Sequence, residues 1–305
     1  MSSIVGGEFL LGNLEKEVLI RQLEALSEFC GIEVLSYCIM SNHYHLLIRV
    51  PKDVKLTDLE LHQRVVNYYG KGSKEAYRLN QMLAEEGEIP SLWREKYLSM
   101  MGDLSVFQKL YKQRFSVWYN KRVGRRGTLW MERFKSLLIE DSFLARLALS
   151  SYIHLNPLRA GLVKDPAAYR YSSYGRAMVG NERARAGLVS ATGEDNWKEA
   201  QGVYREFILV RGMLDQKQNE RVISEELLAE ARKRHGSISM SQLIRLRIRY
   251  FSDGLVLGGE EFVERVYHQY RDRFGEKRRK GSRRMQGGAW GELRVIRDLR
   301  KEVIG

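Results

Sequence analysis

Two short apolar runs near the N-terminus constrain the fold more than any other feature of the sequence. IEVLSYCIM and HYHLLIRV, residues 32–40 and 43–50, are rich in β-branched and aromatic side chains and are joined by a Ser-Asn pair. Such runs predict a β-hairpin, whose second strand ends at Pro51. Because helical patterns lie on both sides of the hairpin, strands and helices alternate along the chain.

The helical patterns come from apolar side chains spaced three and four residues apart. Residues 14–30 predict an amphipathic helix that ends at Gly31. Residues 57–120 look helical throughout, with Asp103 as the N-cap of the last stretch. These helices would flank the sheet to which the hairpin belongs.

A further strand and helix follow this region. Residues 134–140 predict a strand, and Asp141 is expected to cap a helix that stops at Pro157. Residues 196–210 predict a helix that closes the first domain. The expected fold class is therefore α+β, an antiparallel sheet with flanking helices, plus a C-terminal helical region.

The C-terminal region is expected to be smaller and mostly helical. Residues 220–235 and 237–251 both have helical patterns. We expect two domains, residues 1–213 and residues 214–305, with the second as a candidate auxiliary DNA-binding domain. This second domain could contain a helix-turn-helix, or it could be a solvated basic tail; the sequence leaves both interpretations open.

Composition excludes several classes of protein. The 305 residues are 44% hydrophobic with only 4 Pro, which excludes disordered and collagen-like chains. No apolar run approaches the roughly 18 residues of a membrane span, and the N-terminus lacks a signal-peptide pattern, so we expect a cytoplasmic protein with no membrane partner. Cys30 and Cys38 have no zinc or redox spacing and are expected to be buried, reduced thiols.

The formal charge of +13 is concentrated in two windows. Residues 109–135 carry nine Lys and Arg against one acid, and residues 271–284 carry eight against two. An isolated charge run is usually a solvated face, but aromatic residues interleave the first window, which suits phosphate contacts with base stacking. Core packing is the alternative for Trp130. The candidate DNA contacts in the two windows are Arg125, Arg126, Trp130, Arg133, Lys135, Arg278 and Arg279.

His43 and His45 lie in the second predicted strand with one residue between them. Alternate residues of a strand face the same side, so two imidazoles about 6–7 Å apart along the strand can share one divalent metal. The alternative is a solvent-facing or hydrogen-bonded pair without metal. A histidine-triad phosphoesterase would need a third His at the position of Leu47, so that interpretation is weak. A third ligand must come from elsewhere.

Tyr152 and Asn156 are four residues apart in the helix predicted before Pro157, so both project from one face. Pro157 disfavours α geometry at Asn156, which places the amide at a helix end. A core or surface phenol is the commoner role for a single tyrosine, since the chain has 16 Tyr. The spacing alone does not identify a nucleophile.

Three separated motifs resemble, in their order, the REP-associated tyrosine transposases and the single-tyrosine HUH transposases of small insertion sequences. The motifs are YCIMSNHYHLLIRV, then LWMERFKSLLIEDSFLARLALSSYIHLNPLRAGLV, then YRYSSYG. The resemblance extends over most of residues 1–180. It implies a HUH nuclease fold, ferredoxin-like or RRM-like, for the catalytic domain of residues 1–213.

The resemblance also implies a site and a reaction. His43 and His45 would bind Mg²⁺ or Mn²⁺, Asn156 would be the third ligand, and Tyr152 would be the nucleophile. The implied substrate is single-stranded DNA beside imperfect hairpins, such as REP-like sequences or insertion-sequence ends, cleaved through a 5′-phosphotyrosine. Arg159, together with the basic residues of the first window, would offset phosphate charge, with a surface role as the alternative. A nucleoid-associated location and a homodimer are compatible with this family.

Two departures from the family pattern keep a second hypothesis open. Met1 falls almost on the segment SSIVGGEFLLG, so the first strand looks truncated, and residues 72–98 form a longer insertion than the smallest members carry. The first hypothesis is a metal-dependent transposase that nicks and joins DNA. The second is a domesticated protein that binds a repeat hairpin and regulates without cutting. The four candidate site residues together favour the enzyme, whereas the truncated strand favours the binding protein.

Overall fold

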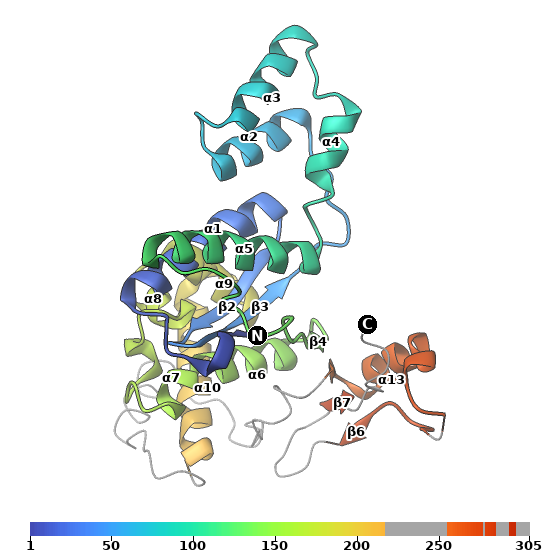
Figure 1. Cartoon of the computed structure of the whole chain (residues 1–305). Coiled ribbons are helices and arrows are strands. Elements are labelled where there is room, and N and C mark those ends of the chain that lie inside the picture. Colours follow the sequence, from blue (N-terminus) through green and yellow to red (C-terminus); the bar gives the residue numbers. More distant parts are fainter. Residues whose placement is uncertain (217–254, 277, 285–292, 297–305) are drawn as a thin grey trace. The chain divides into compact units, whose positions relative to one another are not determined.

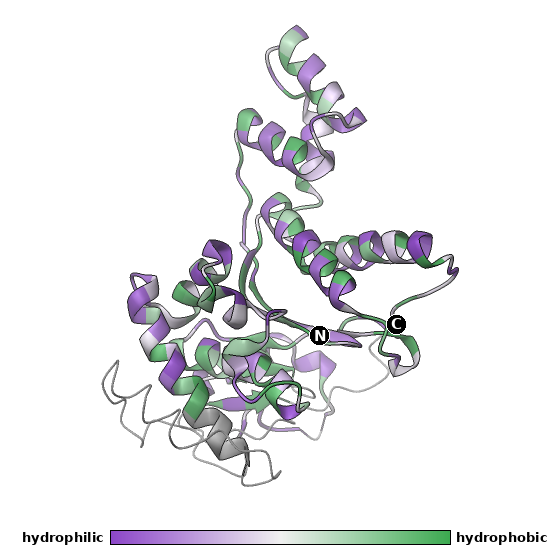
Figure 2. Ribbon diagram, turned by 90° about the vertical axis from the view of Figure 1, so that its left-hand side faces the viewer, coloured by the Kyte–Doolittle hydropathy of each residue, from purple (hydrophilic) through white to green (hydrophobic). Residues whose placement is uncertain are grey.

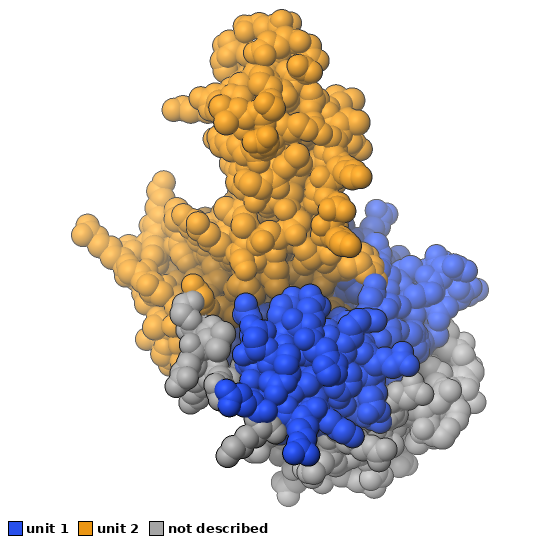
Figure 3. All heavy atoms as spheres, turned by 90° about the vertical axis from the view of Figure 1, so that its right-hand side faces the viewer, with its two compact units in different colours: residues 1, 35–38, 135–305 blue, residues 2–34, 39–134 orange. Residues whose placement is uncertain are grey.

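The structure is a computed structural model that describes residues 1–216, 255–276, 278–284 and 293–296 (Figure 1). The chain forms two compact units, which Figure 3 distinguishes by colour. One, here called the hairpin unit, comprises residues 2–34 and 39–134. The other, here called the tyrosine unit, comprises residue 1, residues 35–38 and residues 135–305. Each is described by itself.

A three-stranded sheet of order β1-β3-β2 carries the predicted hairpin. Its strands are β1 (Ser2–Ser3), β2 (Glu33–Ile39) and β3 (His43–Arg49). β1 pairs antiparallel with β3, with Ser2 opposite Tyr44. The backbone N–H of Met40 donates to the carbonyl of His43 at 2.8 Å, which closes the turn between β2 and β3. The hairpin and the α+β class with a small antiparallel sheet and flanking helices are confirmed.

Five helices of the hairpin unit follow the predicted helical patterns. They are α1 (Asn13–Cys30), α2 (Asp58–Tyr69), α3 (Lys74–Glu85), α4 (Ser91–Leu98) and α5 (Leu104–Val123). α1 ends at Gly31, whose φ of 67° only glycine adopts readily, and the Asp103 carboxylate caps α5 by accepting from the N–H of Val106, so both predictions are confirmed. The stretch predicted as continuously helical is instead four helices, because Gly70, Gly87 and Gly102 have positive φ between them.

The core of the hairpin unit lies between α1, α5 and one face of β3. Tyr44 is fully buried there, its hydroxyl donates to Gln108 Oε1 at 2.7 Å, and its ring lies 5.2 Å from that of Tyr111. α2 to α4, at the top of Figure 2, carry hydrophilic and hydrophobic residues together. Both cysteines are buried thiols, as predicted, and burial raises the pKa of Cys30 to about 12.

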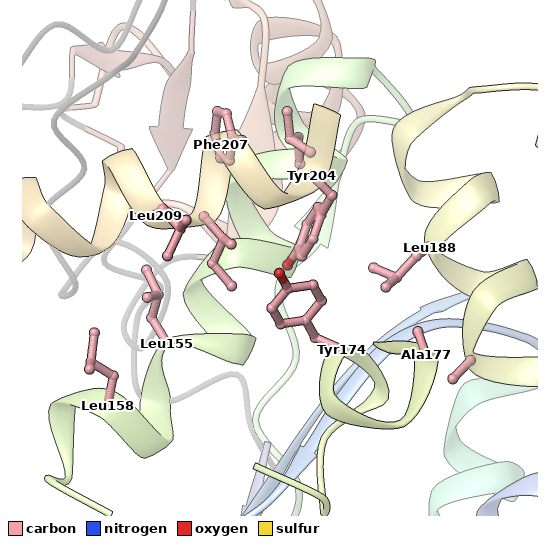
Figure 4. Packing of buried hydrophobic residues seen from close by; sticks show 11 residues of the cluster. Leu155, Leu158, Tyr174, Ala177, Leu188, Tyr204, Phe207 and Leu209 are labelled. Atoms are coloured by element: carbon pink, nitrogen blue, oxygen red, sulfur yellow. The ribbon is translucent and has the colours of Figure 1, made fainter. Parts of the chain in front are cut away.

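The tyrosine unit is built from short helices around one apolar cluster. Its helices before the C-terminal region are α6 (Phe143–His154), α7 (Asn156–Arg159), α8 (Ser173–Met178), α9 (Glu182–Thr192) and α10 (Trp197–Gln216). The cluster includes Leu155, Tyr174, Leu188, Tyr204 and Phe207, and Figure 4 shows side chains of these helices converging on it. α10 confirms the helix predicted for residues 196–210. Single 3-10 turns lie at Val5–Gly7, Pro166–Ala168 and Arg271–Arg273.

A second sheet joins segments that are far apart in the sequence. Its strands are β4 (Leu138–Ile139), β5 (Val256–Gly258), β6 (Arg283–Arg284) and β7 (Arg294–Ile296), in the order β4-β5-β7-β6, and α13 (Glu260–Gln269) follows β5. β4 pairs parallel with β5, whereas β7 pairs antiparallel with β5 and β6. The described part of the C-terminal region, expected to be mostly helical, therefore contains strands as well as helix α13. The domain boundary between residues 213 and 214 stays a prediction.

Three local expectations near α6 were wrong in detail. The strand predicted for residues 134–140 is reduced to β4, because its partner β5 is also short. Ser142, not Asp141, is the N-cap of α6, and Asp141 forms an ion pair with Arg146 instead. α6 ends at His154, and Pro157 lies inside α7, where the first turn needs no N–H donor. The helices predicted for residues 220–235 and 237–251 lie outside the described residues.

Within the described residues, no helix is both long and apolar enough to cross a membrane.

The apolar cluster of the tyrosine unit gives a stability prediction. Leu188 is fully buried in it, so Leu188→Ala should lower the free energy of unfolding by about 2–5 kcal/mol through lost burial and a residual cavity. Val179→Ala, at a side chain that is 83% exposed, is the control and should change it by less than about 0.5 kcal/mol. Urea denaturation followed by circular dichroism measures both, and equal effects would contradict the packing described.

Candidate active site

The two predicted metal ligands of β3 lie side by side. The ring centroids of His43 and His45 are 4.9 Å apart, with the planes nearly perpendicular at 87°. His43 is half-buried and His45 is buried. Tyr44 between them packs into the core on the other face, as the alternation of a strand requires. The structure thus brings the two imidazoles together as the sequence predicts.

The surroundings of His43 favour a neutral, ligand-competent ring. Its Nδ1 lies 2.7 Å from Asn42 Oδ1, an acceptor, so Nδ1 carries the proton and Nε2 keeps its lone pair. Burial lowers the pKa of His43 below its ordinary value, which keeps the imidazole neutral at pH 7. A neutral imidazole held by an oxygen acceptor through its other nitrogen is the usual state of a histidine that binds a metal.

A metal ion bound by His43 and His45 would need further ligands. No group of three or more His, Cys, Asp or Glu side chains within them could hold a metal ion. A divalent cation on the imidazole pair would therefore take its further ligands from other oxygens: a side-chain amide, water, or the anionic oxygens of a DNA phosphate. Oxygen-rich ligand sets of this kind suit Mg²⁺ and Mn²⁺.

The predicted nucleophile lies near the end of α6. The Tyr152 side chain is 6% exposed, and the guanidinium of Arg159 lies 5.1 Å from the centre of its ring. Arg159 Nη1 also donates to the backbone carbonyl of Tyr152 at 2.9 Å. Arg159, predicted as a phosphate contact, therefore also caps the helix and stacks on the tyrosine.

Asn156 has a local structural role that leaves one of its atoms available. Its Nδ2 donates to the carbonyls of Tyr152 at 2.9 Å and Ile153 at 3.1 Å, so the amide satisfies the last turn of α6. Both amide protons are thus engaged, and Oδ1 is the atom that can accept a hydrogen bond or coordinate a cation. This orientation is compatible with the predicted role of Asn156 as a ligand.

The tyrosine unit contains a buried histidine that the sequence interpretation missed. His154 is fully buried, its Nδ1 contacts the hydroxyl of Tyr204, and its Nε2 lies 2.7 Å from Ser173 Oγ. Burial lowers the pKa of His154 to about 3, so the ring is neutral. Its place in the predicted helix, two residues after Tyr152 and four after Ser150, is the signal that could have identified it.

The predicted catalytic and metal residues fall into two groups. His43 and His45 belong to the hairpin unit, whereas Tyr152, Asn156 and Arg159 belong to the tyrosine unit. Within each group the residues are in contact or share hydrogen-bond partners.

Trp130 packs in the core of the hairpin unit. It is 6% exposed, its Nε1 donates to the Lys112 carbonyl at 3.1 Å and to Ser116 Oγ at 3.0 Å, and its ring lies 5.4 Å from that of Tyr44. A DNA base needs an open ring face for stacking. The structure therefore corrects the stacking hypothesis in favour of core packing.

The basic candidates differ in how far they are engaged within the protein. Arg126, Arg133, Lys135 and Arg279 have exposed side chains, which suits contacts with phosphate. Arg125 is half-buried.

Arg278 is used mainly to hold its own loop. Its Nε donates to the carbonyl of Lys280 at 3.1 Å and its Nη2 to that of Gly281 at 2.8 Å, while the guanidinium lies 5.1 Å from the ring centre of Phe274. These contacts leave it poorly placed as a phosphate contact, in contrast to Arg279.

Part of the chain matches the model of one known protein family. Residues 9–103, about a third of the chain, match the model of a family described as IS200-like transposases. The match includes His43 and His45 and ends before Tyr152. It is a likeness to transposases over this part of the chain. No curated protein and no solved structure matches the chain.

The burial of Trp130 generates a prediction. Trp130→Phe should lower the free energy of unfolding by about 1–3 kcal/mol, because two hydrogen bonds and part of the ring are lost from a packed site. Affinity of the folded variant for single-stranded oligonucleotides should stay within about two-fold of wild type. Trp93→Phe, at a half-buried ring between Arg78 and Lys96, is the matched control for stability. A stable variant with much weaker DNA binding would restore the stacking role.

Substitutions of exposed arginines in the C-terminal region should change the salt dependence of DNA binding. Substitution of Arg278, which is hydrogen-bonded within its own loop, should not. Arg279→Gln with Arg283→Gln should reduce the slope of log affinity against log salt by about 1.4 to 1.8, because each phosphate contact contributes about 0.7 to 0.9. Arg278→Gln should instead lower the stability of this region. Fluorescence anisotropy across a salt series measures the slope. An unchanged slope in the double variant would remove this surface from the DNA interface.

Proposed function

Since the match over residues 9–103 supports membership of the IS200-like and REP-associated transposases, we propose that the protein cleaves and rejoins single-stranded DNA beside hairpins, with Tyr152 as the nucleophile. The observation that carries the proposal is the pair of adjacent imidazoles on β3, which lies within the matched region. Tyr152, near the end of α6, and Asn156, the first residue of α7, would supply the remaining chemistry. The proposal requires both groups to act on the same phosphate.

The reaction is a transesterification that needs no external energy source. The phenol oxygen of Tyr152 attacks the phosphorus, the bond from phosphorus to the 3′ oxygen breaks, and the phenol proton ends on that oxygen. The products are a 5′-phosphotyrosine and a free 3′-OH. The same step in reverse, with a 3′-OH of another strand, rejoins the DNA and releases the tyrosine.

His43, His45 and Asn156 would hold Mg²⁺ or Mn²⁺ through two imidazole nitrogens and the amide oxygen Oδ1. When bound, such a cation withdraws charge from the non-bridging phosphate oxygens and orients the scissile bond. The neutral side chains leave the full positive charge of the cation available to the phosphate. Asn42 keeps the His43 ring in its orientation by accepting the proton of Nδ1.

Arg159 supports the nucleophile from within the tyrosine unit. Its guanidinium over the Tyr152 ring stabilises negative charge that develops on the phenol oxygen, and its hydrogen bond to the Tyr152 carbonyl holds the end of α6. The exposed side chains of Arg126, Arg133 and Lys135 supply positive charge for the DNA backbone.

A covalent-adduct assay tests the proposal. Wild-type protein, Mn²⁺ and 5′- or 3′-labelled single-stranded hairpin oligonucleotides should give an adduct that denaturing gels resolve, carrying only the strand 3′ of the cut. Tyr152→Phe should abolish the adduct, since the oxygen that attacks is removed. His43→Ala and His45→Ala should lower its rate by at least about 100-fold, and chelation with EDTA should stop it.

Tyr77→Phe, at an exposed tyrosine of α3, is the matched control and should leave the adduct unchanged. An adduct that survives Tyr152→Phe would assign a different nucleophile. Tight hairpin binding by wild type without any adduct on the repeat sequences of its own genome would favour the regulator that binds without cutting.

A further inference from the structure

A buried polar network lies on the side of α6 that faces β2. His154 connects the hydroxyl of Tyr204 in α10, through Nδ1, with Ser173 Oγ in α8, through Nε2 at 2.7 Å. Ser173 Oγ in turn accepts the backbone N–H of Tyr37 in β2 at 2.9 Å. All these side chains are nearly or fully buried, so the hydrogen bonds are not exchanged for water.

A second tie joins α6 to β2 one turn earlier. Ser36 Oγ and Ser150 Oγ are 2.8 Å apart, and both residues are fully buried. Ser150 and His154 are four residues apart and therefore lie on one face of α6. Two contacts one turn apart on the same face fix both the rotation of a helix about its axis and its position along that axis.

Tyr152 lies midway between these two residues in sequence. At about 100° per residue it projects from α6 roughly 200° away from each of them, on the opposite face. Any rotation of α6 about its axis therefore moves the phenol oxygen, whereas the two ties to β2 prevent that rotation.

We propose that Ser150 and His154 are positioning residues that hold the back of α6 on β2 and thereby aim Tyr152. This inference rests on the proposed role of Tyr152 as nucleophile. Directional hydrogen bonds suit this purpose better than apolar packing, because they fix one arrangement of the two elements where apolar contacts tolerate small shifts. A displacement of about 1 Å in a reacting atom can cost on the order of 100-fold in rate.

The same network explains the conformation of the YRYSSYG segment. Ser172 caps α8 by accepting the N–H of Gly175 at 3.0 Å, which places the next residue, Ser173, between His154 and β2. A Cβ on Gly175 would lie 2.2 Å from the carbonyl of Tyr169, so only glycine allows this close approach. The segment thus serves the orientation of the tyrosine helix.

The test separates the rate of the chemical step from DNA affinity. Tyr204→Phe and Ser150→Ala each remove one hydroxyl from the network and retain most of the packing. Both should lower the single-turnover rate of adduct formation at saturating hairpin DNA and Mn²⁺ by about ten- to hundred-fold, with the dissociation constant for DNA within about two-fold of wild type. Thr192→Val is the matched control, because it removes a buried hydroxyl that, among the described residues, donates to carbonyls of α9 itself. It should leave the rate unchanged even where it lowers stability.

Hydrogen exchange supplies a readout that does not depend on activity. The amides of Tyr37 and of α6 should exchange faster in Tyr204→Phe and Ser150→Ala than in Thr192→Val. Wild-type rates at saturating DNA in both network variants would overturn the positioning role while leaving the proposed function intact. Absence of an adduct in wild type would overturn the proposed function and the positioning role with it, whereas altered exchange would still show that the network anchors α6.

Discussion

The two faces of β3 impose the constraint on which the rest of the hairpin unit depends. Tyr44 is fully buried against Tyr111 and Trp130, and its hydroxyl needs Gln108 as a partner. A slip of one residue would turn this phenol outward and drive His43 and His45 into the aromatic core. The burial of one tyrosine therefore fixes the register with β1 and, with it, the side of the sheet on which the imidazole pair lies.

The sequence predicted the elements whose causes are local. The hairpin, the end of α1 at Gly31 and the cap of α5 by Asp103 depend on residues within a few positions of one another, and all three are confirmed. The second sheet depends on the pairing of β4 with β5, more than a hundred residues later in the sequence. A strand of two residues is too short to show an alternating pattern, so the sequence gives no sign of this pairing. The N-cap of α6 is a different case, because the competing partner is local: Arg146 in the first turn of α6 engages the Asp141 carboxylate, and Ser142 becomes the N-cap.

The sequence identifies candidate site residues, but it predicts poorly what each side chain contacts in the folded protein. The pairing of His43 with His45 follows from strand alternation alone. The roles of Trp130, Arg159 and Arg278 do not, because each combines a charged or polar group with a body that can pack, and their partners are set by tertiary structure. The indole N–H of Trp130 donates to groups inside the hairpin unit. The guanidinium of Arg278 donates to two carbonyls of its own loop. The excess charge of the sequence thus does not show which arginine side chains are exposed and which are engaged within the protein.

α6 shows how one helical segment can carry three separate tasks. Its polar back face holds it to β2, its opposite face carries Tyr152, and its last carbonyls are satisfied by Asn156 and Arg159. Residues with these different tasks are neighbours within SSYIHLN. A substitution at one of them can therefore shift the backbone of the next. Because the amide protons of Asn156 complete the helix end, its oxygen is oriented by the same hydrogen bonds that hold the backbone of Tyr152. The positions of Tyr152, the proposed nucleophile, and Asn156, the proposed ligand, are therefore coupled through the backbone of a single turn.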